Sequence, residues 1–352
     1  MKRILLVGAG HAHLSVLRSF AKEALHGMRV TLVTPLARQI YSGMLPGVIA
    51  GHYRLDDAQV DIEALCARAY VEFTPGSVDA LDLQARRASL EGGENLDYDV
   101  ISLNPGSRVE RSLPGAERTL LVKPLDEFLA ALDRKRLGRV AIVGAGAAGA
   151  ELAMALGYRG AAITLYSDRP TPPGAAGELI AQALRRAGVD FRPGMAVSAV
   201  EQGPVILAGP SRQDFDLVIL AAGSAAPAWL ASAGLAVDGL GFVLVHDTLQ
   251  STSHPEVFVS GDCATVRDAP HPRSGVYAVR HGESLAANFR NLAGGNPLEP
   301  YVPQARALML LSCGSRRAIA QRGGWTVEGY WVWCWKDWID RRFVRGFVSP
   351  AA

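Results

Sequence analysis

Two glycine clusters, far apart in the sequence, have the spacing that allows a backbone turn to hold a phosphate group. Gly8 and Gly10 open the first cluster, and Gly144, Gly146 and Gly149 form the second. Glycines at these positions permit a tight turn and bring backbone N–H groups to a pyrophosphate at the start of the next helix. One such cluster is weak evidence, but two in the same context favour two nucleotide sites.

Each cluster lies between a predicted strand and a predicted helix. Apolar residues over 3–7 indicate a buried strand, helical spacing of apolar positions follows up to Gly27, and 30–34 indicates the next strand. The same order recurs at 139–143, along a helix containing Glu151, and at 163–166. The pattern predicts an α/β protein with two Rossmann-like dinucleotide-binding domains.

A third candidate feature is a carboxylate at the end of an apolar strand. Residues 257–260 run into Gly261 and Asp262, where the glycine allows close approach and the carboxylate can accept hydrogen bonds from a sugar-alcohol chain. Two further strands run into glycine turns that contain Gly106 and Gly223. We expect these turns to lie at the points where the chain leaves each nucleotide-binding unit.

The order of these motifs resembles that of flavoproteins with two dinucleotide-binding domains, which include type II NADH dehydrogenases, sulfide:quinone reductases and disulfide reductases. Within this class, His11-Ala-His13, the segments 41–47 and 51–53, 276–280 and 336–342 are similar to the pyridine-nucleotide oxidoreductase often fused to the N-terminus of selenophosphate synthetase. The resemblance covers nearly the whole chain. Since no synthetase domain follows, we expect a stand-alone member.

The resemblance implies an FAD-binding domain over 1–110 and 242–300, an NAD(P)-binding domain over 111–241, and a short α-containing C-terminal segment over 301–352. The implied FAD contacts are Gly8, Gly10, His11, Ala12, Thr34 near the ribose, Val78 near adenine, Gly106, Gly261 and Asp262. Two residues depart from the usual pattern: His13 replaces the third glycine, and Thr34 replaces a ribose-binding carboxylate.

The resemblance also implies a site for NADH or NADPH. The residues implied are Gly144, Gly146, Gly149, Ser167, Arg169 and Gly223. Because Ser167 stands where an acid would bind the ribose of NADH and Arg169 is nearby, the site leans toward NADPH. Asp168 could restore NADH binding through a shift of one residue, so the choice stays open.

Three side chains are candidates for a role in the reaction. Lys123 matches a lysine near the flavin in related enzymes, although an exposed lysine before a helix is a comparable interpretation. Glu151 could position the nicotinamide or relay a proton. Alternatively, it could be present only because a carboxylate near a helix N-terminus interacts favourably with the helix dipole. His281 could supply protons to an acceptor, or could be an ordinary partly buried histidine.

Composition narrows the remaining classes. A formal net charge of +2 gives no global reason to expect nucleic acid as a partner. The four cysteines, Cys66, Cys263, Cys313 and Cys334, form no pair of the kind a dithiol relay or a zinc site uses, so neither is predicted. The N-terminal apolar run is too short for a signal peptide, and we expect a cytoplasmic protein.

The last part of the chain is aromatic and basic. Residues 325–347 hold five of the six tryptophans. Val332, Trp335, Ile339 and Phe343 are expected on one helical face, complemented by the basic residues Lys336, Arg341, Arg342 and Arg345. Such a helix could lie on the inner face of a membrane, pack on its own core or form a homodimer contact.

These observations favour an FAD-dependent NAD(P)H dehydrogenase that passes electrons to a quinone or another small acceptor. A reductase serving selenium or sulfur metabolism is an alternative that rests on the fusion partner of the relatives. A flavin-binding sensor or assembly partner is the alternative without an enzymatic role.

Overall fold

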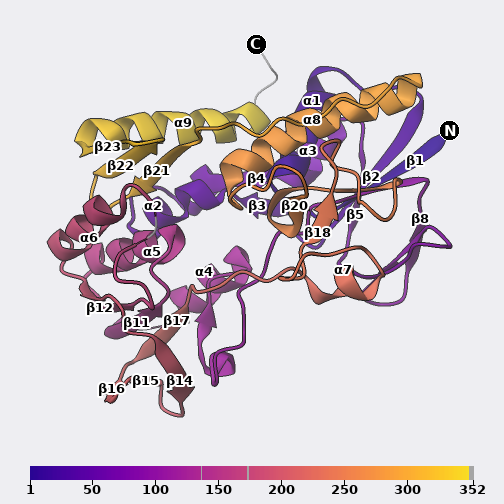
Figure 1. The fold of residues 1–352 in the computed structure, drawn as a ribbon. Coiled ribbons are helices and arrows are strands. Elements are labelled where there is room, and N and C mark those ends of the chain that lie inside the picture. Colours follow the sequence, from indigo (N-terminus) through magenta and orange to yellow (C-terminus); the bar gives the residue numbers. More distant parts are fainter. Residues whose placement is uncertain (136, 173, 349–352) are drawn as a thin grey trace.

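The computed structural model describes residues 1–135, 137–172 and 174–348. Its first sheet contains five parallel strands in the order β19-β9-β1-β2-β5. The strands are β1 (Lys2–Val7), β2 (Met28–Thr34), β5 (Glu72–Pro75), β9 (Val100–Leu103) and β19 (Val257–Val259). Helices α1 (His11–Lys22) and α8 (Gly275–Gly294) pack against each other beside this sheet (Figure 1).

The second sheet repeats this architecture. Its five parallel strands have the order β10-β17-β11-β12-β13. They are β10 (Leu120–Leu121), β11 (Arg139–Val143), β12 (Ala162–Tyr166), β13 (Asp190–Arg192) and β17 (Leu217–Leu220), accompanied by α4 (Leu125–Asp133), α5 (Ala147–Tyr158) and α6 (Gly177–Arg186). Two Rossmann-like units are present, so the predicted fold class is confirmed.

Each unit also carries a three-stranded antiparallel sheet. In the first it consists of β6 (Val78–Asp82), β7 (Arg87–Leu90) and β8 (Asn95–Asp97), and in the second of β14 (Val197–Glu201), β15 (Val205–Ala208) and β16 (Ser211–Asp214). The shorter elements are β3 (Arg38–Ile40), β4 (Gln59–Asp61), β18 (Val243–Val245), β20 (Ala264–Val266), α2 (Leu45–Ile49), α3 (Ile62–Arg68) and α7 (Ala228–Ser232).

The hydrophobic cores show how the second unit is inserted into the first. The core around the first sheet takes in Phe258 and Phe289 from late in the chain. Leu230 and Leu235 also lie in this core, although the predicted boundary at residue 241 assigned them to the second domain. The chain therefore returns to the first core soon after β17 ends.

The C-terminal segment contains a sheet that the sequence did not predict. Strands β21 (Leu308–Ser312), β22 (Ala318–Arg322) and β23 (Trp325–Gly329) pair antiparallel and precede helix α9 (Tyr330–Val348), which packs on β22 and β23 (Figure 1). Trp325 therefore belongs to a strand. Among the described residues, no helix combines the length and apolar character needed to span a bilayer.

The sequence grouped Lys336 with the basic residues that complement the apolar face of this helix, but the structure places it in the buried line instead. The side chain is only 5% exposed and pairs with Asp340. The buried line of α9 runs through Val332, Lys336, Asp340, Val344 and Phe347. Lys336 can occupy it because Asp340, one turn further on, supplies a matching buried charge.

Candidate active site

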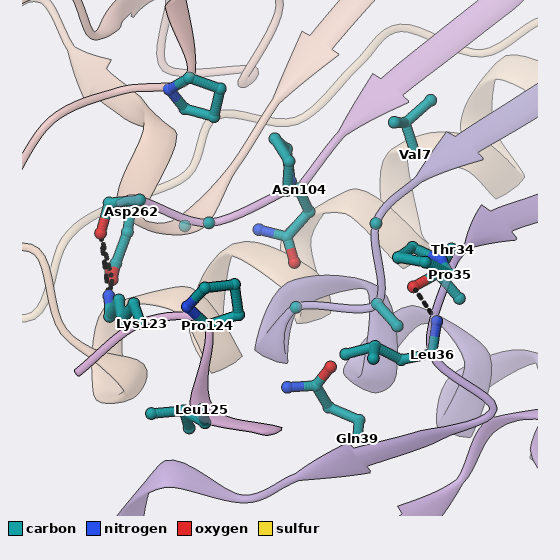
Figure 2. Close-up of a pocket in the computed structure, with 18 of the residues that line it drawn as sticks. Val7, Thr34, Pro35, Leu36, Gln39, Asn104, Lys123, Pro124, Leu125 and Asp262 are labelled. Atoms are coloured by element: carbon teal, nitrogen blue, oxygen red, sulfur yellow. Dashed lines mark hydrogen bonds and ion pairs between the residues drawn. The ribbon is translucent and has the colours of Figure 1, made fainter. Parts of the chain in front are cut away.

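One cleft brings together segments that are far apart in the sequence. It is lined by the turn after β1, the ends of β2 and β9, the start of β6, residues 123–126 and the turn after β19, and its volume is about 300 Å³. In Figure 2, Thr34 lies at one end, Lys123 and Asp262 at the other, and Asn104 between them. The predicted FAD contacts that line the cleft are Gly8, Gly10, His11, Thr34, Val78, Gly106, Gly261 and Asp262.

The first glycine turn is held against Asn104, a residue that sequence reasoning did not select. Gly8 has a positive φ of 84°, and a Cβ atom there would lie 2.6 Å from the carbonyl oxygen of Asn104. A Cβ atom on Gly10 would overlap the Asn104 side-chain amide. That amide donates to the Ser260 carbonyl oxygen at 2.7 Å and so ties this turn to the one that follows β19.

His13, which replaces the usual third glycine, makes buried hydrogen bonds at this position. Its Nδ1 donates to the Gly8 carbonyl oxygen at 2.6 Å, and its Nε2 accepts from the Ser102 hydroxyl at 2.8 Å. The ring is fully buried, and burial lowers the pKa of His13 to about 4. In the second motif, a Cβ atom on Gly149 would overlap the carbonyl oxygen of Gly144. The first motif thus replaces a close backbone approach by a neutral hydrogen-bonded ring.

Ala12 is not among the residues that line this cleft. A Cβ atom on Gly282 of α8 would overlap the Ala12 carbonyl oxygen, so Ala12 lies at the contact between α1 and α8. Its implied contact with FAD stays a prediction.

Lys123 and Asp262 join the two nucleotide-binding units. Lys123 Nζ lies 3.0 Å from Asp262 Oδ2 and 2.9 Å from Ser107 Oγ, as Figure 2 shows for the ion pair. Lys123 follows β10 of the second sheet, whereas Asp262 follows β19 of the first. A cation and a hydroxyl therefore orient the carboxylate at the cleft wall.

His11 presents a buried polar atom without a partner among the described residues. Its Nε2 makes no hydrogen bond there. Burial lowers the pKa of its ring, Asp262 opposes this shift, and Lys123 adds to it. A buried unpaired nitrogen is costly. Together with the glycine turn and Asp262, it fits a cleft that receives a polar dinucleotide.

The second glycine turn has the backbone geometry of the first. Gly144 has a φ of 108°, and a Cβ atom there would lie 2.8 Å from Ala222 Cα, while Gly223 has a φ of 69°. No described heavy atom lies within 4 Å of a Cβ atom built on Gly146, so this face of the turn is open. These features fit a second dinucleotide.

The end of β12 carries the residues expected to discriminate between NADH and NADPH. Ser167 is buried, and its hydroxyl accepts from the backbone N–H of Arg169 at 3.1 Å. The Arg169 side chain is exposed. The turn thus presents a guanidinium and a hydroxyl in place of the usual ribose acid.

Glu151 points toward the C-terminal segment. Its Oε1 accepts from the Ser312 backbone N–H at 2.6 Å, and it does not line the cleft described above. Burial raises the pKa of Glu151 to about 7, an effect that Lys336 partly opposes.

A polar network continues from Lys336 toward the cleft. Lys336 Nζ donates to the Gly43 carbonyl oxygen and to Asp340, both at 2.6 Å, and the Tyr41 hydroxyl lies 3.3 Å from Asp340 Oδ1. The Tyr41 ring contacts the ring of His11, with 5.5 Å between their centroids. Tyr41, Lys336 and Asp340 were missed as site residues because they meet only in the folded chain.

His281 is fully buried and does not line the cleft. Its Nδ1 accepts from the backbone N–H of Gly261 at 3.0 Å. The predicted role as a proton donor stays a prediction.

All four cysteines are free. Cys263, next to Asp262, lies 3.2 Å from the Ser260 carbonyl oxygen, and burial raises the pKa of its thiol to about 12. Cys66 and Cys313 are also buried. The described residues contain no group of three or more His, Cys, Asp or Glu side chains that could hold a metal ion.

Comparison with known proteins identifies the class. The family model described as pyridine nucleotide-disulphide oxidoreductase matches residues 2–282, and the chain belongs to this family. Members of the family are FAD- and NAD(P)H-dependent oxidoreductases.

Among characterised relatives, the chain is 33% identical over 196 residues to the nitric oxide reductase FlRd-NAD(+) reductase of Aeromonas salmonicida. That match covers 52% of this chain and 50% of the relative, so it spans half of the relative's length. An NADH dehydrogenase-like protein of Mycobacterium tuberculosis is 28% identical over 81% of this chain and 78% of its own.

Two solved structures share the fold along almost the whole chain. The NDH2 of Plasmodium falciparum in complex with NADH has a TM-score of 0.83 at 12% identity and covers 99% of this chain and 97% of its own. The sulfide:quinone oxidoreductase of Aquifex aeolicus has a TM-score of 0.82 at 18% identity, with 99% and 91% coverage.

Proposed function

We propose that this chain binds FAD in the cleft between Thr34 and Asp262, oxidises NAD(P)H on the second glycine turn, and passes the electrons to a quinone. Bound FAD supplies the step that accepts a hydride and releases electrons. The NADH dehydrogenase-like protein of Mycobacterium tuberculosis, 28% identical over 81% of this chain, supports NADH oxidation as this class of reaction.

The observation that carries the quinone assignment is the buried Glu151 carboxyl, which interacts electrostatically with Lys336 and Asp340 of the hydrogen-bonded group Lys336, Asp340 and Tyr41. Reduction of a quinone by NAD(P)H consumes the hydride and one further proton. A buried carboxyl whose pKa is about 7 can hold that proton near neutral pH. The four cysteines are free and three of them are buried, so they offer no comparable dithiol route.

The cleft residues have separate roles in this proposal. Asp262, oriented by Lys123 and Ser107, binds the sugar-alcohol hydroxyls. The N-terminus of α8 opens on the cleft at Gly275, and its dipole stabilises negative charge there. Arg169 favours NADPH over NADH through its charge.

The C-terminal helix supports a peripheral site of action. Trp331 and Trp338 are each more than half exposed, and the spacing of seven residues places them on one face of α9 with Arg342 and Arg345. Aromatic and basic groups on one helical face suit the surface of an anionic membrane, where quinones reside. This part of the proposal places the protein on the inner face of the membrane.

An anaerobic experiment tests the reaction. The purified protein should carry FAD, NADPH or NADH should bleach its absorbance, and a water-soluble quinone should restore it. Protein that contains no flavin, or flavin that neither nicotinamide bleaches, would overturn the proposal. Reoxidation by selenium or sulfur compounds but not by quinone would overturn the quinone assignment, and a turnover equal to that of free flavin would favour a sensor.

A further inference from the structure

His281 and His271 support the turn that carries Asp262. They lie behind this turn, outside the lining of the cleft. The backbone N–H of Gly261 donates to His281 Nδ1 at 3.0 Å. His281 Nε2 lies 3.1 Å from His271 Nε2, and His271 Nδ1 lies 3.2 Å from the Pro272 carbonyl oxygen. His281 is fully buried and His271 half-buried.

This chain of hydrogen bonds fixes the tautomer of both rings. Because the Gly261 N–H is a donor, His281 Nδ1 must carry a lone pair, and the neutral ring then carries its proton on Nε2. His281 Nε2–H therefore donates to His271 Nε2, which must be unprotonated. The neutral His271 ring then carries its proton on Nδ1 and donates it to the Pro272 carbonyl oxygen. An additional proton on either ring breaks one of the two bonds that His281 makes.

The turn itself has little freedom to rearrange. Gly261 has a φ of 69°, and a Cβ atom there would lie 2.5 Å from Asn104 Nδ2. Asn104 holds the Ser260 carbonyl oxygen, and His281 holds the next N–H along the chain. Without His281, that buried N–H loses its acceptor, which is a substantial penalty.

We propose that His281 and His271 act as a neutral imidazole pair that positions Gly261 and Asp262 for the cofactor, and that uptake of a proton by the pair releases this turn. The inference rests on the proposed FAD site and gives His281 a positioning role in place of proton donation.

The surroundings of the pair disfavour the charged form. Tyr277 stacks on His271 with 4.4 Å between ring centroids, and Tyr301 meets His281 edge to face at 4.5 Å. Burial lowers the pKa of both histidines; Arg273 adds to this at His271, and Asp262 opposes it at His281. Burial also raises the pKa of Tyr301 to about 12, although Arg280 opposes that rise, so Tyr301 stays neutral at physiological pH.

Four variants separate positioning from proton transfer and from general destabilisation. His281→Asn keeps an acceptor near the position of Nδ1 without a titrating ring, whereas His281→Leu removes the acceptor. His271→Gln keeps an acceptor near the position of Nε2 and does not titrate. His26→Asn, at an exposed histidine after α1, is the matched control.

The first readout is the dissociation constant of FAD, measured at pH 7.5 and pH 4.0 on apoprotein to which FAD is added back. We expect the wild type and His26→Asn to bind about tenfold more weakly at the lower pH. His281→Leu should bind about tenfold more weakly than wild type at pH 7.5, while His281→Asn and His271→Gln should bind nearly as wild type there and lose most of the pH dependence. Wild-type affinity in His281→Leu, or an unchanged pH ratio in His271→Gln, would overturn the pair's role.

The second readout needs no variant and is independent of activity. Long-range ¹⁵N NMR of histidine-labelled protein should show His281 protonated on Nε2, His271 protonated on Nδ1, and both rings titrating well below the ordinary pKa of histidine. The opposite tautomer of His271, or titration of either ring near its ordinary pKa, would overturn the inference. Failure of the wild type to bind FAD at pH 7.5 would instead overturn the proposed function, since the tautomers of the pair are measured separately.

Discussion

At the scale of single residues, Glu151 shows how burial changes the chemistry of a side chain. It was selected from the sequence for its place on the helix after the second glycine turn. The structure adds the buried setting, which raises the pKa of this carboxyl to about 7 although the hydrogen bond from Ser312 lowers it. A carboxyl in that range exchanges protons at the pH of the cell.

The variant Glu151→Gln tests this carboxyl. It keeps an acceptor for the Ser312 N–H but cannot release a proton, so quinone reduction at pH 6.5 should fall about tenfold or more. In the wild type this rate should decline as pH rises through 7 and the proton is lost, and the variant should lack that decline. Steady-state rates from pH 5.5 to 8.5 measure this, with flavin bleaching by NAD(P)H remaining within about twofold of wild type.

Stability gives an independent check on the same group. Because the folded state holds a proton that the unfolded carboxyl releases above its ordinary pKa of 4.5, wild-type stability should fall between pH 4.5 and 7. Glu151→Gln should show a flatter profile in that window. Glu178→Gln, at an exposed position on α6, is the control, and an equal flattening there would contradict the assignment.

His13 makes a second residue-scale prediction, since restoring the usual glycine should harm the protein. His13→Gly leaves the Gly8 carbonyl and the Ser102 hydroxyl without their buried partner and opens a cavity, at a cost of about 3 kcal/mol. Urea denaturation measures the loss. His26→Gly should cost less than about 1 kcal/mol, and comparable losses in both variants would refute the role given to His13.

At the scale of elements, α1 and α8 pack with their backbones in close contact. A Cβ atom on Gly282 would overlap the Ala12 carbonyl oxygen and lie 2.6 Å from Ser15 Cβ. Gly282→Ala should therefore separate the helices, destabilise the protein by about 2 kcal/mol or more and weaken FAD retention. Thermal unfolding and flavin content after dialysis measure both effects.

The matched control lies on α9. At Gly346 the nearest atoms to a new Cβ belong to the flexible Arg18 side chain at 3.6 Å, so Gly346→Ala should be neutral or stabilising by up to about 1 kcal/mol. Unchanged stability of Gly282→Ala would contradict the close packing of α1 and α8.

Helix α9 depends on its internal buried ion pair. Lys336→Met leaves Asp340 buried without its cation and should cost about 3 kcal/mol. The double variant Lys336→Met, Asp340→Leu removes both charges and should recover most of that loss. Chemical denaturation of the two variants measures the difference, and equal losses would show that the pair does not form.

At the scale of the whole molecule, the position of α9 connects the fold to its proposed site of action. Trp331→Ala with Trp338→Ala should lower binding to vesicles rich in phosphatidylglycerol about tenfold, because two interfacial aromatic side chains are lost. Vesicle cosedimentation measures this, and added salt should weaken wild-type binding. The rate with a water-soluble quinone should be unaffected.

An exposed aromatic on the first unit provides the control for this experiment. Tyr70→Ala, between α3 and β5, should bind vesicles as the wild type does. If the wild type does not bind vesicles, and if it is a dimer that the double tryptophan variant converts to a monomer, this face is a homodimer contact instead.

The sequence alone determined the two Rossmann-like units and most of the cleft, because strand periodicity and glycine turns are local properties. Gly8, Gly10 and Gly261 could be selected since a backbone that must approach another group closely leaves a recognisable residue type. Lys123 and Asp262 were each found separately, but only the folded chain places them 3.0 Å apart across the two units.

Tertiary structure decided the features that depend on which distant segments meet. Asn104 ties two turns together, Lys336 is buried because Asp340 and Gly43 surround it, and His281 pairs with His271 behind the cleft wall. Local sequence patterns likewise did not predict strands β21 to β23 or the buried group of Glu151, Lys336 and Asp340. Charge pairing, burial and tautomer are set by neighbours in space, and the spacing of residues along the chain does not encode them.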